Sequence, residues 1–238
     1  VTRLTGFGLH MQTVTAEKPQ INLNRTVGTT PEIDMNDMEV DLPNGGPIVQ
    51  KLNIKLEPGT NVIIKGASGS GKSTLLRSLA GIWPYVKGGL TMPALDKVMF
   101  IPQKPYLPLG TLRDSVLYPG TKTKTDEELI TLMNLCHIGY LSKYLNEEAD
   151  WSHVFSVGEQ QRLAFVRALI YEPEWLFMDE STSALDEATE AAVYAVVEEQ
   201  LKNTTIVSVG HRSTLNKFHQ LELFLDKEAK TGTLLARA

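Results

Sequence analysis

One short segment of the chain has the residue types and the spacing of a phosphate-binding loop. Residues 66–73 read Gly-Ala-Ser-Gly-Ser-Gly-Lys-Ser and match the pattern G-x-x-x-x-G-K-[ST] at every fixed position. An apolar run, 62–64, precedes the loop and a helical run, 74–80, follows it. The loop N–H groups and the helix N-terminus behind them would together bind the phosphates of a nucleotide.

The residues of this loop have different expected roles. Lys72 would reach the terminal phosphates, and the Ser73 hydroxyl would hold Mg²⁺. By itself the motif predicts a nucleoside triphosphatase (NTPase) without specifying its kind. The predicted nucleotide-binding set comprises the loop and the next residue: Gly66, Ala67, Ser68, Gly69, Ser70, Gly71, Lys72, Ser73 and Thr74.

Two adjacent carboxylates follow a second apolar run, 175–178. Asp179 would lie at the carboxyl edge of a parallel sheet, where ligands bind, and could provide a second anchor for Mg²⁺. Glu180 would point the other way and could act as a general base on an attacking water. The sequence therefore predicts phosphoryl transfer, a reaction that depends mainly on positioning and charge neutralisation.

Two further features indicate a function only in combination with these motifs. Gln103 follows the apolar run 98–101, and its amide could reach both the metal and the water. Ser156 precedes a helical run with Glu159 three residues later, which is the spacing of a capping box. The same helix N-terminus could alternatively bind a second phosphate.

The composition excludes some classes of protein. The 238 residues are 42% hydrophobic and 21% charged, as in an ordinary globular protein, and the net charge of −5 argues against a nucleic-acid binder. The single cysteine, Cys136, cannot form an internal disulfide or a zinc cluster, so we expect it to pack in the core. The sequence shows neither a signal peptide nor a stretch able to span a bilayer. We therefore expect no bilayer insertion by this segment, and a reducing compartment facing the cytoplasm.

The order of apolar runs predicts an α/β fold. Strands are expected between residues 32 and 58 with a turn at 44–46, at 98–101 with both faces buried, at 175–178 and at 205–209, with a closing hairpin over 221–235. Helices are expected at 158–171 and 187–202, and residues 111–150 read as an inserted helical lobe. Strands that alternate with helices predict a mostly parallel sheet. Residues 1–30 read as a linker.

At these residues the sequence resembles the nucleotide-binding domain of ATP-binding cassette (ABC) proteins, over nearly all of residues 32–238. The family's motifs occur in order: the Walker A motif at 66–73, the Q-loop at Gln103, the signature at 155–160, the Walker B motif at 176–179, the D-loop at 183–186 and the switch histidine at His211. The resemblance implies a P-loop NTPase core of RecA-like fold, an N-terminal antiparallel β subdomain and a helical insert at about 104–172. The cassette would cover residues 31–238.

The resemblance also implies a mechanism. Two cassettes would bind two ATP molecules head to tail, so that Ser156, Gly158 and Glu159 serve the partner's ATP. Ser73 and Asp179 would bind Mg²⁺ with Gln103 near it, Glu180 would orient water, and His211 would hold the γ-phosphate. Catalysis would thus rest on Glu180, His211, Gln103 and Lys72.

Finer features, such as residues 81–84, 101–106 and 155–165, are similar to one subfamily. It joins peroxisomal fatty-acyl half-transporters to bacterial carriers of the SbmA/BacA and YddA type. In that subfamily a membrane domain precedes the cassette on the same chain, and residues 1–9 are similar to the end of its last transmembrane helix. The resemblance places the cassette on the cytoplasmic face of a membrane, bacterial inner or peroxisomal.

Two residues depart from the family pattern. Val157 stands at a glycine position of the signature, and its Cβ forbids backbone angles open to glycine. Leu42 stands where many cassettes carry an aromatic residue that stacks on adenine, so we expect only apolar contact with the base there. A strong difference in affinity between ATP and GTP would contradict this hypothesis.

Two alternatives to a transporter motor remain at this point. A soluble ABC ATPase of translation or DNA maintenance would share the motifs, but Lys72 and Asp179 are only 107 residues apart, with no coiled-coil insertion between them. A P-loop GTPase or kinase is disfavoured by the signature helix at Ser156 and by the position of His211.

Overall fold

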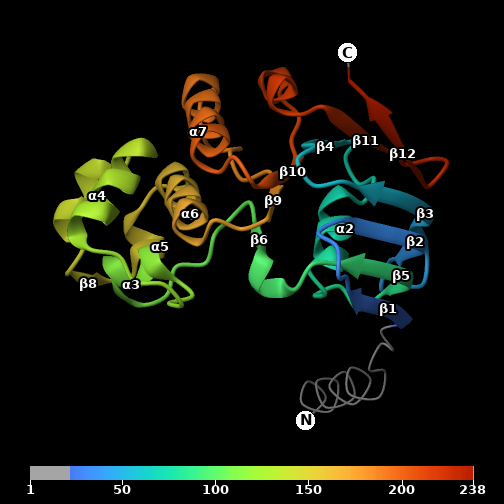
Figure 1. Ribbon diagram of the computed structural model, residues 1–238, viewed down its shortest axis with the longest axis horizontal. Helices are drawn as coiled ribbons and strands as arrows, with labels where there is room; N and C mark the ends of the chain where they lie inside the picture. The colour runs from blue at the N-terminus through green and yellow to red at the C-terminus, as the bar shows by residue number, and fades with distance from the viewer. Residues whose placement is uncertain (1–21, 238) are drawn as a thin grey trace, which may run out of the picture.

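The computed structural model describes residues 22–237 and consists of two lobes (Figure 1). The larger lobe contains two β-sheets, and the smaller lobe, on the left in Figure 1, is mainly helical. The expected helix end at 1–9 and the first part of the expected linker lie outside the described residues. In the described part, no helix combines the length and the apolar character that crossing a membrane would require.

A six-stranded sheet forms the centre of the larger lobe, in the order β12-β11-β4-β10-β9-β6. The strands are β4 (Val62–Lys65), β6 (Val98–Ile101), β9 (Trp175–Asp179), β10 (Thr205–Val209), β11 (Leu221–Asp226) and β12 (Thr231–Ala236). Every neighbouring pair is parallel except β11 and β12, which form the expected hairpin. The prediction of a mostly parallel sheet is confirmed.

Alternate residues of the central strands pack on opposite faces of this sheet. In β9, Trp175 and Phe177 join one hydrophobic core, whereas Leu176 and Met178 join the other. The first core includes helix α2 (Lys72–Leu79), and the second includes α6 (Val157–Tyr171) and α7 (Glu187–Gln200). With helices on both faces, β9 is apolar at every position before Asp179, as the sequence predicted.

Strand β6 differs from its prediction. Val98, Met99 and Phe100 are only partly buried, and Ile101 alone is fully buried. The reason is its position, because β6 is the edge strand of the sheet and pairs only with β9. An apolar run of this length cannot distinguish an edge strand from a central one.

A second sheet, in the order β1-β5-β2-β3, covers α2. It contains β1 (Asn22–Val27), β2 (Ile33–Asp41), β3 (Pro47–Leu56) and β5 (Val86–Met92). Strand β2 pairs antiparallel with β3 and β5, and β3 alternates between buried and exposed residues as expected from 52–56. Strand β1 was not expected: it lies within the predicted linker and pairs parallel with β5.

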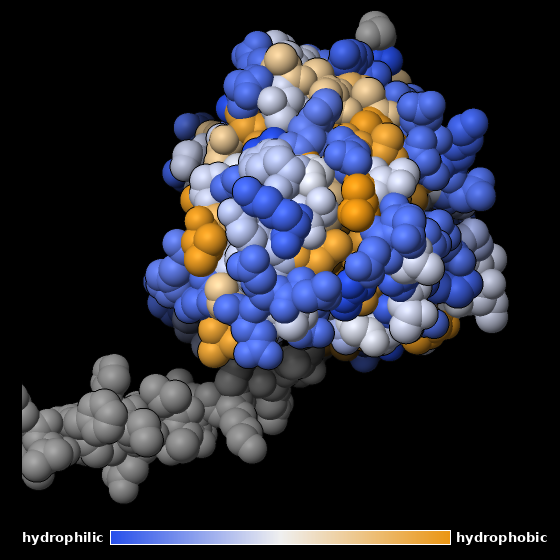
Figure 2. Space-filling view, turned by 90° about the vertical axis from the view of Figure 1, so that its left-hand side faces the viewer, coloured by the Kyte–Doolittle hydropathy of each residue, from blue (hydrophilic) through white to orange (hydrophobic). Residues whose placement is uncertain are grey.

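The smaller lobe packs along α6. It contains α3 (Leu112–Leu117), α4 (Asp126–Leu135), α5 (Trp151–Val154) and the two-residue strands β7 (Gly110–Thr111) and β8 (Glu148–Ala149). The strands were not predicted, because two residues give no periodicity. Short 3₁₀ helices occupy Leu95–Lys97, Gly139–Tyr144 and Ser213–Phe218. Figure 2 shows that the outer face of this lobe is largely hydrophilic, with hydrophobic residues mostly set apart from one another.

Cys136 packs at the end of α4, as expected of a small apolar residue. Its side chain is fully buried among apolar neighbours of the lobe. Burial raises the pKa of the Cys136 thiol to about 12, so the thiol stays protonated at neutral pH.

Candidate nucleotide-binding site

The predicted phosphate-binding loop lies between β4 and α2, and its geometry requires glycine. Gly66 and Gly71 have φ values of 148° and 94°. A Cβ on Gly66 would collide with the Leu225 carbonyl oxygen, and one on Gly71 would collide with Ile48. Both residues therefore let the loop approach neighbouring strands as well as turn.

Helix α2 presents an open N-terminus at this loop. Its N-cap is Gly71, which provides no side-chain hydrogen bond, and its first turn carries no acidic residue. The backbone N–H groups of that turn are therefore left for an anion. A cleft of about 210 Å³ opens here, lined by Ser68, Gly69, Gly71, Lys72, Ser73, Thr74, Glu180 and His211.

The Lys72 ammonium lies within the loop. Its Nζ donates hydrogen bonds to the carbonyl oxygens of Gly66 (2.9 Å) and Ala67 (3.0 Å). Burial lowers the pKa of Lys72, and the nearby charges of Glu180 and Asp179 oppose this shift. A partly desolvated cation whose bonded partners are neutral carbonyls is well suited to attract a phosphate.

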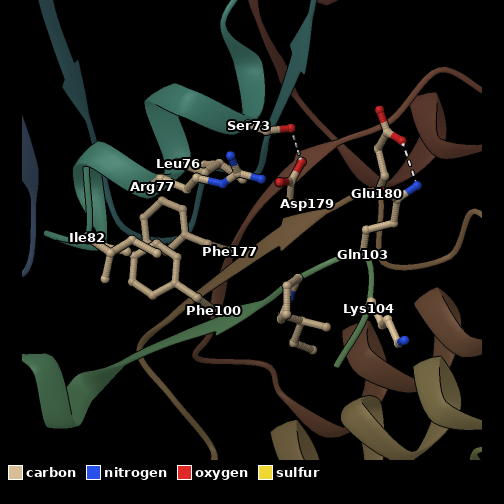
Figure 3. Close-up of a pocket in the computed structure, with 13 residues that line it drawn as sticks. Ser73, Leu76, Arg77, Ile82, Phe100, Gln103, Lys104, Phe177, Asp179 and Glu180 are labelled. Atoms are coloured by element: carbon tan, nitrogen blue, oxygen red, sulfur yellow. Dashed lines mark hydrogen bonds between the residues drawn. The ribbon is translucent and has the colours of Figure 1, made fainter. Parts of the chain in front are cut away.

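Ser73, which lines this cleft, also contacts Asp179, as shown in Figure 3. Ser73 Oγ donates a 2.7 Å hydrogen bond to Asp179 Oδ1, across 106 residues of sequence. Burial raises the pKa of Asp179, and the Ser73 hydrogen bond partly offsets this shift. A hydroxyl and a carboxylate oxygen at this spacing fit Mg²⁺, which typically takes one or two protein oxygens together with phosphates and waters.

Three strand ends bring Gln103, Glu180 and His211 together. Gln103 follows β6, Glu180 follows β9 and His211 follows β10. Gln103 Nε2 donates to Glu180 Oε2 at 3.3 Å (Figure 3), and His211 Nε2 lies 3.3 Å from Glu180 Oε1. The Glu180 carboxylate is thus contacted from both sides, next to the cleft that holds Lys72.

The backbone also fixes Glu180. Its φ is +48°, which is uncommon for a residue other than glycine, and its N–H donates to the Val209 carbonyl oxygen at 3.1 Å. A second cleft, of about 440 Å³, extends from Ser73 and Glu180 toward the stacked rings of Phe100 and Phe177. A carboxylate between two clefts and held in this way can orient a water for attack.

The structure does not bring every predicted residue to this cleft. The backbone of Leu42 is held by Gly46 in the turn after β2, its side chain is 42% exposed, and it is not among the residues that line the cleft. Ser156, Gly158 and Glu159 lie at the N-terminus of α6, and the lining of the cleft includes none of them. Their roles remain predictions.

One contact at the phosphate-binding loop was missed by the sequence reasoning. Lys227, in the turn between β11 and β12, donates to the Ser68 carbonyl oxygen at 3.1 Å and adds a second cation at the loop. Ser70 Oγ is buried in the loop with no hydrogen-bond partner among the described residues. A lysine in a polar hairpin turn gives no signal, since only the pairing of β11 with β4 brings it near.

Gln161 was missed as well. It is fully buried in α6, and its Nε2 donates to the Gln103 carbonyl oxygen (2.9 Å) and to Ser183 Oγ (3.2 Å). Its Oε1 accepts the Ala184 N–H at 3.1 Å. One amide therefore joins α6 to the segments after β6 and β9. Gln161 lies in a run of polar residues at the start of α6, and such a run gives no sign that one of them is buried.

Comparison with known proteins identifies the family. The family model described as ABC transporter matches residues 49–183, which is more than half of the chain. The chain belongs to the ABC transporter family. It is an ATP-binding cassette, the domain with which this family binds and hydrolyses ATP, and the resemblance seen in the motifs is confirmed.

Curated relatives include both bacterial and eukaryotic proteins. An uncharacterized ABC transporter ATP-binding protein of Haemophilus influenzae is 38% identical over 204 residues, covering 85% of this chain and 34% of that protein. ABC transporter D family member 3 of Dictyostelium discoideum is 35% identical, covering 82% of this chain and 28% of that protein. ATP-binding cassette sub-family D member 3 of Homo sapiens is 34% identical, covering 82% and 30%.

These relatives favour a transport ATPase over the soluble ATPase and over the GTPase or kinase. They include members of the D family, as the finer motifs predicted. The chain spans about a third of the length of the relatives it matches. Cassettes of the ABC transporter family dimerise, work with transmembrane domains and lie at the cytoplasmic face of membranes.

Proposed function

We propose that this ABC cassette drives movement of a substrate across a membrane by hydrolysing Mg²⁺-ATP with Glu180 as the general base. The proposal rests on one observation. Gln103 and His211 both contact the Glu180 carboxylate, which lies beside the phosphate-binding loop. In this arrangement a water held by Glu180 faces the γ-phosphate, and Glu180 accepts its proton.

The other residues of the cleft bind and orient. Lys72 and the loop N–H groups would hold the β- and γ-phosphates, while Ser73 and Asp179, with Gln103 beside them, would hold Mg²⁺. The metal ion supplies charge neutralisation at the phosphate oxygens. His211 would hold the γ-phosphate. Leu42 provides apolar contact with the adenine.

A second copy of the cassette completes each site. We assign Ser156, Gly158 and Glu159 to the partner's ATP because they lie outside the lining of their own cleft. The N-terminus of α6 is held by a capping box, so these residues keep a fixed geometry before the partner arrives. Such head-to-tail contacts make an isologous interface.

The cassette acts, in this proposal, with a transmembrane domain that precedes it on the same chain. The greater length of the relatives, about three times the matched segment, supports this arrangement. The cassette would comprise residues 31–238 together with β1, which lies in the predicted linker 1–30 but pairs with β5. We place it at the bacterial inner membrane, with the peroxisomal membrane as the alternative, and we expect neither nucleic acid binding nor insertion of this segment into the bilayer.

The decisive variant is Glu180→Gln. It should retain ATP binding, reduce hydrolysis by about 100-fold or more, and trap a dimer of cassettes, since general-base catalysis contributes about 10²–10⁴-fold. ATPase rate, nucleotide titration and light scattering with Mg²⁺-ATP measure the three effects. Glu198→Gln, an exposed change on α7, is the matched control. Hydrolysis by Glu180→Gln at the parent rate would remove Glu180 from the role of base.

Lys72→Ala tests the other half of the site. It should weaken ATP binding itself by about 10- to 100-fold, because hydrogen bonds to charged groups contribute about 1.5–3 kcal/mol. Isothermal titration with ATP measures the loss. Unchanged affinity would show that the loop N–H groups hold the phosphates without the lysine.

A further inference from the structure

Glu190 has a buried carboxylate close to the proposed catalytic pair, Glu180 and His211, and none of the predicted motifs includes it. Glu190 is in the first turns of α7, and its side chain is 2% exposed. We propose that Glu190 is a positioning residue that locks the segment after Glu180 to the segment after His211 and so sets the geometry of that pair. The inference rests on the function proposed above, and it extends that function to a residue that does not touch the nucleotide.

Glu190 uses both of its oxygens to join the two segments. Its Oε1 accepts a 2.6 Å hydrogen bond from Thr182 Oγ1, two residues after Glu180. Its Oε2 accepts a 2.8 Å hydrogen bond from Thr214 Oγ1, three residues after His211. A single carboxylate thus spans two segments whose parent strands, β9 and β10, are neighbours in the sheet.

Arg212 closes the same connection. Its Nη1 lies 3.6 Å from Glu190 Oε1 and donates a 2.7 Å hydrogen bond to the Leu185 carbonyl oxygen. Arg212 is the residue directly after His211. Its guanidinium therefore contacts both the Glu190 carboxylate and Leu185, at the end of the segment after Glu180. We call Thr182, Glu190, Arg212 and Thr214 the carboxylate clamp.

The clamp lies next to the reacting groups. A cavity of about 190 Å³ is lined by Glu180, Thr182, Glu190, His211 and Arg212, together with Ser183, Val209, Gly210 and Leu215. The His211 side chain is 58% exposed, so surrounding packing does little to hold it. Its position follows from the backbone on either side, which the clamp fixes through Arg212 and Thr214.

A purely structural role for Glu190 would be to stabilise the N-terminus of α7, where a negative charge is favourable. That terminus is already capped, since Asp186 accepts the N–H of Thr189 at 2.9 Å and Glu187 adds a charge in the first turn. Burying a further carboxylate is costly unless it is fully bonded. Here the bonds go to the two catalytic segments rather than to the N–H groups of the helix.

The main test compares Glu190→Gln with Glu198→Gln in the full chain. Glutamine keeps the shape and removes the charge and one acceptor, while Glu198 is an exposed glutamate of the same helix. We expect Glu190→Gln to lower kcat by about 10- to 100-fold, since a misplacement of about 1 Å is enough for such a loss. KM for ATP should stay within about twofold, because the loop that binds the phosphates is untouched.

A second readout needs no nucleotide. Hydrogen–deuterium exchange should become faster in Glu190→Gln at residues 181–186 and 210–215 together and stay unchanged in the rest of α7. Faster exchange spread through α7 and the core would indicate a structural role and overturn the proposal. So would a folded Glu190→Gln protein with the kcat of Glu198→Gln.

Thr214 provides a test if Glu190→Gln fails to fold. Thr214→Val removes the hydroxyl and should lower kcat, whereas Thr214→Ser keeps the hydroxyl and should recover most of the loss. Equal kcat for these two variants would overturn the proposal. If the wild-type chain itself hydrolyses no ATP, the proposed function fails, and the exchange experiment still decides whether the clamp joins the two segments.

Discussion

The N-termini of α2 and α6 are both predicted to face phosphates, yet the structure builds them in opposite ways. Gly71 leaves the N-terminus of α2 without a side-chain cap or an acidic residue. At α6, Ser156 accepts the N–H of Glu159, and the Glu159 carboxylate accepts the N–H of Ser156. One terminus is therefore ready for an anion within a single chain, whereas the other is satisfied until something replaces its own carboxylate.

The carboxylates beside the two termini also differ, because their pKa values are shifted in opposite directions. Burial raises the pKa of Asp179, so folding without metal makes its ionised form less favourable than in the unfolded chain. Burial also raises the pKa of Glu159, but hydrogen bonds from Tyr140 and Ser156 outweigh it and leave the pKa lowered. The ionised form of Glu159 therefore stabilises the fold, whereas burial opposes the ionised form of Asp179. The comparison thus separates a helix N-terminus that is open to an anion from one that its own carboxylate caps.

Gly66→Ala tests the open N-terminus of α2, and among these variants it should have the largest effect on stability and ATP affinity. The new methyl group would meet the Leu225 carbonyl oxygen. The alanine would also have to adopt the positive φ of Gly66, which is strained for any residue with a Cβ. We expect a loss of roughly 1–3 kcal/mol in stability from the strained backbone and a fall in ATP affinity of more than about tenfold. Chemical unfolding and nucleotide titration measure both.

Gly59→Ala is the control for Gly66→Ala. Gly59 also has a positive φ, of 82°, but a Cβ there meets nothing within 4 Å. It should lower stability without changing ATP affinity. Similar losses of affinity in the two variants would mean that overall strain, rather than the shape of the loop, sets phosphate binding.

Asp179→Asn should sharpen the contrast by stabilising the protein without metal. The raised pKa of Asp179 means that its contribution to stability is present at low pH and is lost as the pH rises through the raised value. Asparagine removes that loss, so Tm at neutral pH should rise above that of the parent. The gain should disappear below about pH 4, where the parent carboxyl is protonated.

Thermal melts without Mg²⁺ at neutral and acidic pH measure the effect of Asp179→Asn. The same variant should lose the stabilisation that Mg²⁺-ATP gives to the parent. A lower Tm at neutral pH would show that the attraction between Asp179 and the cations around it outweighs its burial.

The smallest expected effect is that of Glu159→Gln. Glutamine can still complete the capping box, but the negative charge is gone. The lowered pKa of Glu159 means that its charge adds stability above the ordinary glutamate pKa, and that this is lost as the pH falls through the lowered value. The variant should therefore be slightly less stable at neutral pH and less sensitive to acid.

Removal of the Glu159 charge should also tighten ATP-driven pairing of cassettes by about two- to fivefold, since a charge at a helix N-terminus contributes about 0.3–1 kcal/mol. Analytical ultracentrifugation in the Glu180→Gln background measures the pairing. Glu172→Gln makes the same charge change at the other end of α6 and is the control. Unchanged pairing would place the Glu159 carboxylate away from the partner's phosphates.

Several features of the fold were predictable because they depend on neighbours in sequence. The strand, loop and helix around 62–80 follow from an apolar run, glycines and a helical run. The alternation in β3 and the apolar run of β9 gave their burial correctly. Strand β1 and the edge position of β6 were missed, since a partner strand decides them and it lies elsewhere in the chain.

The sequence by itself determined the class of ligand, because glycine geometry and a lysine next to a helix start are local properties. Only the tertiary structure decided which side chains surround Glu180: Gln103 is 77 residues away, and the order of the parallel strands brings the two together. The same holds for Gln161 and Glu190, polar residues in helices whose roles depend on the segments packed against them. Local pattern fixes the conformation of each piece of backbone, whereas contacts between distant pieces arise only when the sheet and its cores assemble.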